Sequence, residues 1–138
     1  MVFPKGYSFV CGLYKDIHGK DGLYIYHLMR VAGRMKTEKE QMVALLHDSV
    51  EDNLTTLGVI EDKFGKEVAE AVDAITRRKD ESYSEYITRV SKNDIARKVK
   101  IQDLIDNSNL ARLETVTLED TKRQLKYAKA LQKLMSME

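Results

Sequence analysis

Apolar residues recur at helical spacing along almost the whole chain, and this pattern restricts the fold to packed α-helices. Three segments carry capping boxes, in which a hydroxyl residue is followed three positions later by an acid: Thr37 with Glu40, Ser82 with Glu85, and Thr117 with Asp120. Proline occurs once in 138 residues and glycine seven times, so turn signals for a β-sandwich or barrel are scarce. We therefore predict an all-α, single-domain bundle over residues 1–138, with seven or eight helices and no clear strand.

The expected helices share apolar stripes and polar or glycine-bearing boundaries. They are placed at about 8–16, 24–35, from 37 through the acidic segment at 47–52, from Thr55 or Thr56 to Gly65, 67–77, 83–91, from Asn93 or Asp94 through 105, and from 117 to 135.

Charge and cysteine content exclude several classes of protein. The net charge of +1 gives no overall attraction to nucleic acid or membrane, so a nucleic-acid partner is not expected. The single cysteine, Cys11, cannot form an internal disulfide and fits a reducing compartment. No apolar run approaches the roughly 18 residues of a membrane span, and no signal-peptide pattern is present. The sequence predicts a soluble cytoplasmic protein and leaves its oligomeric state open.

The segment His47-Asp48-Ser49-Val50-Glu51-Asp52 concentrates four groups that can bind a metal or move protons. It follows the apolar run 42–46 directly, where a merely solvated helix face has no need of a His-Asp pair. If the segment is helical, residues four apart share a face, which sets Glu51 over His47 and Asp52 over Asp48. This pattern is typical of a divalent-metal hydrolase.

Two further residues complete a candidate ligand set. His27 lies in the expected second helix, and Asp103 lies in an apolar helix stripe, where an unpaired carboxylate would be costly. With His47 and Asp48 they provide two imidazoles and two carboxylates, which suit one Mn²⁺ or another borderline divalent ion. Such an ion activates water and polarises a phosphoryl group. Glu51 and Asp52 are then candidates to orient the water or transfer protons.

These residues, in this order, resemble the H…HD…D signature of the HD superfamily of metal-dependent phosphohydrolases. The segments ALLHDSVEDNLTT at 44–56 and FGKEVAEAVDAIT at 64–76 resemble the hydrolase domain of RelA/SpoT-type proteins. The segment NDIARKVKIQDLIDNSNLARL at 93–113 is similar to a late helix of their stand-alone relatives, the small alarmone hydrolases. The resemblance covers roughly residues 17–131.

The resemblance implies an all-α domain that binds one Mn²⁺ and removes the 3′-diphosphate from ppGpp and pppGpp, giving GDP or GTP and pyrophosphate. It implies metal ligands at His27, His47, Asp48 and Asp103, and a catalytic acidic pair at Glu51 and Asp52. It further implies substrate contacts, which fall on Lys20, Asn107 and Tyr127.

Two positions depart from the family pattern. The loop before His27 is several residues shorter than usual and lacks both family prolines. Asp106 stands where members often carry histidine or lysine. We expect its side chain on the solvent side of the helix, and a role near the metal is the alternative.

Two alternatives remain open. The same machinery would also suit another nucleotide phosphate ester, such as a nucleoside 5′-monophosphate or NADPH, and the short loop makes this alternative relevant. A nucleotide-binding module without turnover is the other alternative, although a sensor would not need the Glu51-Asp52 pair.

Overall fold

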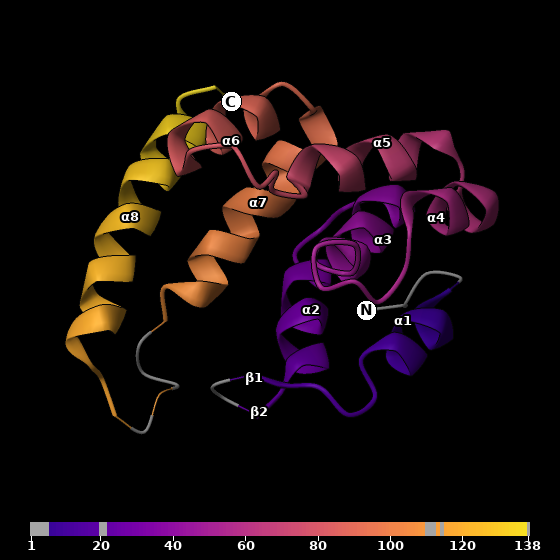
Figure 1. Ribbon diagram of the computed structural model, residues 1–138, viewed down its shortest axis with the longest axis horizontal. Helices are drawn as coiled ribbons and strands as arrows, with labels where there is room; N and C mark the ends of the chain where they lie inside the picture. Colours follow the sequence, from indigo (N-terminus) through magenta and orange to yellow (C-terminus); the bar gives the residue numbers. More distant parts are fainter. Residues whose placement is uncertain (1–5, 20–21, 110–112, 114, 138) are drawn as a thin grey trace.

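The structure, a computed structural model, describes residues 6–19, 22–109, 113 and 115–137. Within this part the chain forms eight α-helices and one small antiparallel hairpin (Figure 1). The elements, in chain order, are α1 (Tyr7–Leu13), β1 (His18–Gly19), β2 (Gly22–Leu23), α2 (Tyr24–Ala32), α3 (Glu38–Leu46), α4 (Leu57–Phe64), α5 (Lys66–Ile75), α6 (Tyr83–Ser91), α7 (Asp94–Asn107) and α8 (Leu118–Met135). The predicted all-α class is confirmed, and the two-residue strands before α2 were not predicted.

The helix starts follow the capping signals in the sequence. All three predicted capping boxes form, with the hydroxyl of Thr37, Ser82 or Thr117 accepting from the N–H three residues later. Where the sequence left two choices, the side chains of Thr56 and Asn93 cap α4 and α7. A cap satisfies N–H groups that have no partner inside the helix, so these local signals set where each helix begins.

The prediction that the third helix continues through the acidic segment is wrong. Helix α3 ends at Leu46, whose carbonyl accepts from both the N–H and the hydroxyl of Ser49. Residues 47–53 run in successive turns, and Asn53 adopts a left-handed conformation with φ 59°. The hydrogen bonds of Ser49 compete with helix continuation, which is a known property of serine.

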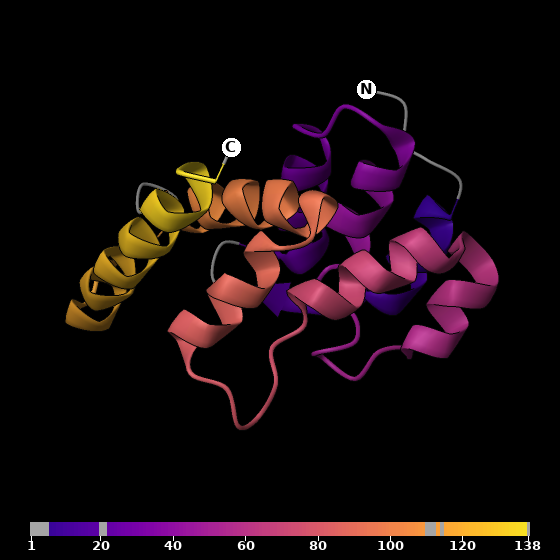
Figure 2. The ribbon, with the colours of Figure 1, turned by 90° about the horizontal axis from the view of Figure 1, so that it is seen from above.

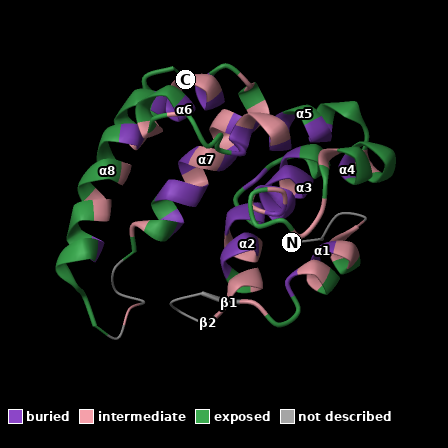
Figure 3. Ribbon diagram, in the orientation of Figure 1, coloured by how far each residue is buried: buried purple, intermediate pink, exposed green. Residues whose placement is uncertain are grey.

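Helix α7 is the central element and packs against α2, α3, α5, α6 and α8. It carries buried Val99 and Leu104 within one cluster of buried apolar side chains. Helix α8 runs alongside α7 in the opposite direction and is largely exposed (Figures 1 and 3). The view from above shows α8 at the margin of the helix assembly (Figure 2). None of the described helices combines the length and apolar character needed to cross a bilayer.

Truncation of Leu104 should show how strongly the fold depends on α7. Leu104 is fully buried beside Asp103, so we expect Leu104→Ala to lower the free energy of unfolding by about 2–5 kcal/mol. Leu125 on α8 is 60% exposed, so Leu125→Ala should change it by less than about 0.5 kcal/mol. Urea denaturation followed by circular dichroism measures both. Equal effects in the two variants would contradict the central role of α7.

Candidate metal centre

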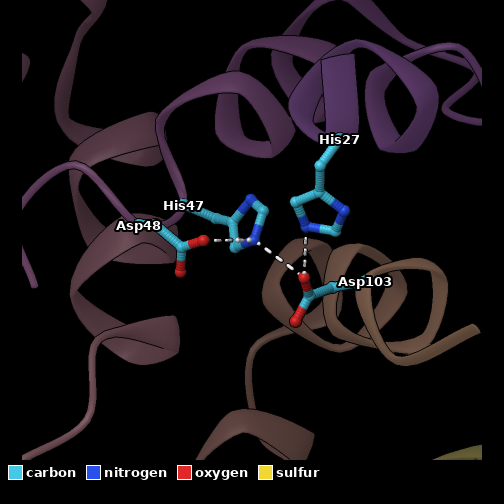
Figure 4. Close-up of side chains that lie close together, drawn as sticks. All are labelled: His27, His47, Asp48 and Asp103. Atoms are coloured by element: carbon cyan, nitrogen blue, oxygen red, sulfur yellow. Dashed lines mark hydrogen bonds and ion pairs between the residues drawn. The ribbon is translucent and has the colours of Figure 1, made fainter. Parts of the chain in front are cut away.

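Four side chains from three separate parts of the chain converge on one point (Figure 4). His27 comes from α2, His47 and Asp48 directly follow α3, and Asp103 comes from α7. One nitrogen or oxygen atom of each lies within 4.8 Å of the others. Nε2 of His27 is 2.8 Å from Oδ1 of Asp103, and Nε2 of His47 is 3.1 Å from the same oxygen. The structure thus brings together all four residues that the sequence singled out as metal ligands.

Each histidine is held from outside this group through its other ring nitrogen. Nδ1 of His47 is 2.6 Å from the carbonyl oxygen of Ala44, which can only accept a hydrogen bond. Nδ1 of His27 is 2.6 Å from Oδ2 of Asp106. With Nδ1–H donating outward in both rings, both Nε2 atoms are directed at Asp103. This is the orientation that histidine ligands take in metal sites.

The carboxylates next to His47 favour a positive charge between the four side chains. Burial alone would lower the pKa of His47, but Asp48 and Asp103 outweigh it and raise the pKa to about 9. The Oδ2 atom of Asp48 lies 3.2 Å from Nε2 of His47. Two nitrogens and two carboxylates facing each other need a cation between them, either a proton or a metal ion. Metal binding at such a site displaces protons from the ligands.

Asp103 is buried, and its carboxylate is paired with side chains of its own helix. Its Oδ2 accepts from Nζ of Lys100 at 2.9 Å, and its Oδ1 accepts from Nδ2 of Asn107 at 3.1 Å. Burial alone would raise the pKa of Asp103, but Lys100 and His47 hold it well below its usual range. The carboxylate therefore stays ionised, as a metal ligand must be.

Asp106 contradicts its predicted place on the solvent side of α7. It is 1% exposed and accepts from Nδ1 of His27 and, at 2.9 Å, from Nε of Arg30. The signal for this arrangement was present in the sequence. Asp106 follows Asp103 by three positions and Arg30 follows His27 by three, so each pair shares a helix face.

Two tyrosines that the sequence analysis did not single out line the same site. The hydroxyl of Tyr24 donates to Oδ2 of Asp48, and that of Tyr14 lies 3.5 Å from Oδ2 of Asp52. Their rings stack with centroids 5.6 Å apart. Burial, together with the nearby Asp48 charge, raises the pKa of both hydroxyls, so they remain protonated donors.

The acidic pair Glu51 and Asp52 lies in the turns beside the four clustered residues and outside their group. Both residues are exposed. Oε1 of Glu51 accepts from the backbone N–H of Arg77 at 3.0 Å, which ties this loop to the connection after α5. Partial desolvation of its carboxyl group, followed by the charges of Asp48 and Glu51, raises the pKa of Asp52. Both carboxylates are thus placed near the cluster without being part of it.

Of the three predicted substrate contacts, one touches a candidate metal ligand, one lies on α8 and one is outside the described residues. Asn107 is exposed in the last turn of α7, with its amide donating to Asp103. Tyr127 is half-buried on α8, where Nζ of Lys126 lies 5.9 Å from its ring centroid. Lys20 lies outside the described residues.

Comparison with known proteins finds relatives whose names refer to guanine nucleotides. A GTP pyrophosphokinase of Myxococcus xanthus is 33% identical over 81 residues, which are 55% of this chain and 11% of that protein. A guanosine-3′,5′-bis(diphosphate) 3′-pyrophosphohydrolase of Aquifex aeolicus (strain VF5) is 30% identical over 96 residues, which are 61% of this chain and 14% of that protein. The similarity to RelA/SpoT-type proteins, predicted from the sequence, is confirmed. This chain thus matches only a small part of each of these two relatives.

A solved structure has the same fold. It is a metazoan ortholog of SpoT, described as hydrolysing ppGpp and playing a role in starvation responses. The two structures agree with a TM-score of 0.76 at 24% identity, over 92% of this chain and 81% of the other. No model of a known protein family matches the chain.

Proposed function

We propose that this protein is a metal-dependent phosphohydrolase that removes the 3′-diphosphate of ppGpp or pppGpp. The observation that carries this proposal is the pair of Nε2 atoms directed at Asp103 with Asp48 beside them, while both Nδ1 atoms are held elsewhere. The two sequence relatives are named for guanine-nucleotide chemistry, and the metazoan protein of the same fold hydrolyses ppGpp. We further propose one hydrolase domain over residues 1–138, acting in the cytoplasm.

The residues present fit one divalent ion. His27, His47, Asp48 and Asp103 would hold it, and two imidazoles with two carboxylates suit Mn²⁺ among the borderline ions. When bound, such an ion lowers the pKa of a coordinated water and polarises a phosphoryl oxygen. Four protein ligands leave positions for a water molecule and for the substrate.

The acidic pair then handles the protons. Water adds to the phosphorus attached to the ribose O3′, and the bond from that phosphorus to O3′ breaks. One proton leaves the water and one proton arrives at O3′, so a single residue that accepts and then donates balances the step. Glu51 and Asp52 lie in the turns that follow the ligands His47 and Asp48, so we assign this transfer to them. The hydrogen bond that the backbone N–H of Arg77 donates to Glu51 fixes the position of this side chain beside the metal ligands.

A substrate panel tests the proposal directly. Purified protein with Mn²⁺ should release pyrophosphate from ppGpp and leave a nucleoside 5′-monophosphate and NADPH largely intact. Turnover of a monophosphate or of NADPH without turnover of ppGpp would show that the alternative phosphate ester is the substrate. Tight binding of ppGpp without hydrolysis at any Mn²⁺ concentration would show a binding module.

Asp106→Asn should weaken metal binding without removing a ligand. Asparagine cannot match the ionised acceptor for His27 and Arg30, so the ring of His27 loses its fixed orientation. Loss of such an outer partner typically lowers metal affinity by about 10–100-fold. Competition with a fluorescent chelator measures the Mn²⁺ affinity. The variant Asp73→Asn, at a half-buried aspartate on α5, is the control. Unchanged affinity in Asp106→Asn would show that Asp106 does not position His27.

A further inference from the structure

Cationic side chains gather around Tyr83, at the start of α6. The guanidinium carbon of Arg77 lies 5.5 Å from the Tyr83 ring centroid, and Nζ of Lys126 lies 4.3 Å from it. Arg77 belongs to the connection after α5 and Lys126 to α8, so three segments that are separate in sequence meet here. We call Arg77, Tyr83 and Lys126 the cation–tyrosine cluster.

The positive charge of this cluster has no paired acid within the described part of the chain. Among the described residues, no carboxylate forms an ion pair with the guanidinium of Arg77 or the ammonium of Lys126. Burial, followed by the like charges of Arg77 and Lys100, lowers the pKa of Lys126. Cations held together without counter-charges repel each other, and a bound anion would remove that cost.

Tyr83 itself is incompletely satisfied. Its hydroxyl oxygen is buried and has no hydrogen-bond partner in the described part of the chain. A buried polar group without a partner destabilises the folded protein. A ligand oxygen that reached this hydroxyl would remove that cost as well. Cation–π contacts meanwhile hold the two charged groups over the ring.

Two connections join the cluster to the candidate metal centre. The ring of Tyr83 contacts that of Tyr86 at a centroid distance of 5.9 Å, and Nζ of Lys100 lies 5.4 Å from the Tyr86 centroid. Lys100 in turn donates to Asp103. On the other side, the backbone N–H of Arg77 binds Glu51. The cluster is therefore linked through Tyr86 and Lys100 to Asp103, and through Arg77 to the acidic pair beside the metal centre.

We infer that Arg77 and Lys126 form an anion subsite that holds a second phosphate group of the nucleotide, distinct from the group that is attacked. This inference rests on the proposed function and specifies its substrate class, a nucleotide with phosphates at two positions. The guanidinium of arginine matches phosphate oxygens in pairs, and lysine adds a point charge. With one diphosphate at the metal centre, the other lies at the cluster. A nucleotide phosphorylated at one position fills only one of the two sites.

Binding of GDP tests the subsite, because GDP retains the 5′-diphosphate and has no 3′-phosphate. Calorimetric titrations with GDP and with guanosine would compare the wild type with the double variant Arg77→Gln/Lys126→Gln, with Mn²⁺ and with EDTA. The double variant removes two charged partners of the diphosphate, so GDP affinity should fall by at least about 10-fold under both conditions. Guanosine affinity should not change. The matched control is Lys79→Gln/Lys129→Gln, which removes two exposed lysines from the same two segments.

Equal GDP affinity in the double variant and the control would overturn the subsite, and so would a loss that is as large for guanosine as for GDP. Thermal melting would confirm that both double variants are folded. The subsite and the proposed function can fail separately. Hydrolysis of ppGpp with the same kcat/KM in the wild type and the double variant would refute the subsite alone. A specific loss of GDP binding in a protein that hydrolyses none of the panel would refute the hydrolase alone.

Discussion

Replacement of His47 or Asp48 with alanine is expected to abolish both metal retention and phosphohydrolase activity. His47 is 1% exposed and Asp48 is half-buried, and each directs one ligand atom into the four-residue group. Loss of one of the four ligands leaves the coordination shell of the ion incomplete, so the metal should no longer be retained. Elemental analysis after dialysis measures the bound metal, and pyrophosphate release from ppGpp measures activity.

Asp48→Ala is the sharper of the two variants, because His47 also packs in the core and its loss risks unfolding. Circular dichroism should show that Asp48→Ala retains its helices. The control is Asp62→Ala, which removes an exposed acid on α4. If Asp48→Ala were to bind Mn²⁺ as well as the wild type does, the ligand set proposed here would be wrong.

Glu51→Gln is expected to separate catalysis from metal binding. The amide oxygen of glutamine can still accept from the N–H of Arg77, so the loop should keep its position. Glutamine cannot carry a proton between water and O3′, so kcat should fall by about 10²–10⁴-fold. Metal content should equal that of the wild type, because Glu51 is not among the four clustered residues.

Glu61→Gln, an exposed glutamate on α4, is the matched control and should retain full activity. A Glu51→Gln protein that had lost its metal would contradict this division of roles. Unchanged kcat with full metal content would transfer the proton-handling role to Asp52 alone. The corresponding Asp52→Asn variant would then be expected to show the loss.

Much of the fold could be predicted because its signals are local. The capping boxes at Thr37, Ser82 and Thr117 each depend on residues only three positions apart, and all of them form. The end of α3 was misplaced because periodicity continues past Leu46, whereas the hydrogen bonds of Ser49 close the helix there. The hairpin before α2 was missed because strands of two residues carry no detectable alternation.

The sequence alone therefore determined the helical class, most helix starts and the four residues that gather at the candidate metal centre. Helix formation and helix starts depend on residues a few positions apart, and the order of the histidines and acids along the chain is visible in the sequence itself. Only the tertiary structure decided how these groups are held. Asp106 meets His27 across 79 positions, and the direction of each imidazole depends on that contact and on the Ala44 carbonyl. Arg77 and Lys126 come together at Tyr83 because α6 packs directly against both α5 and α8, and no local pattern encodes that packing.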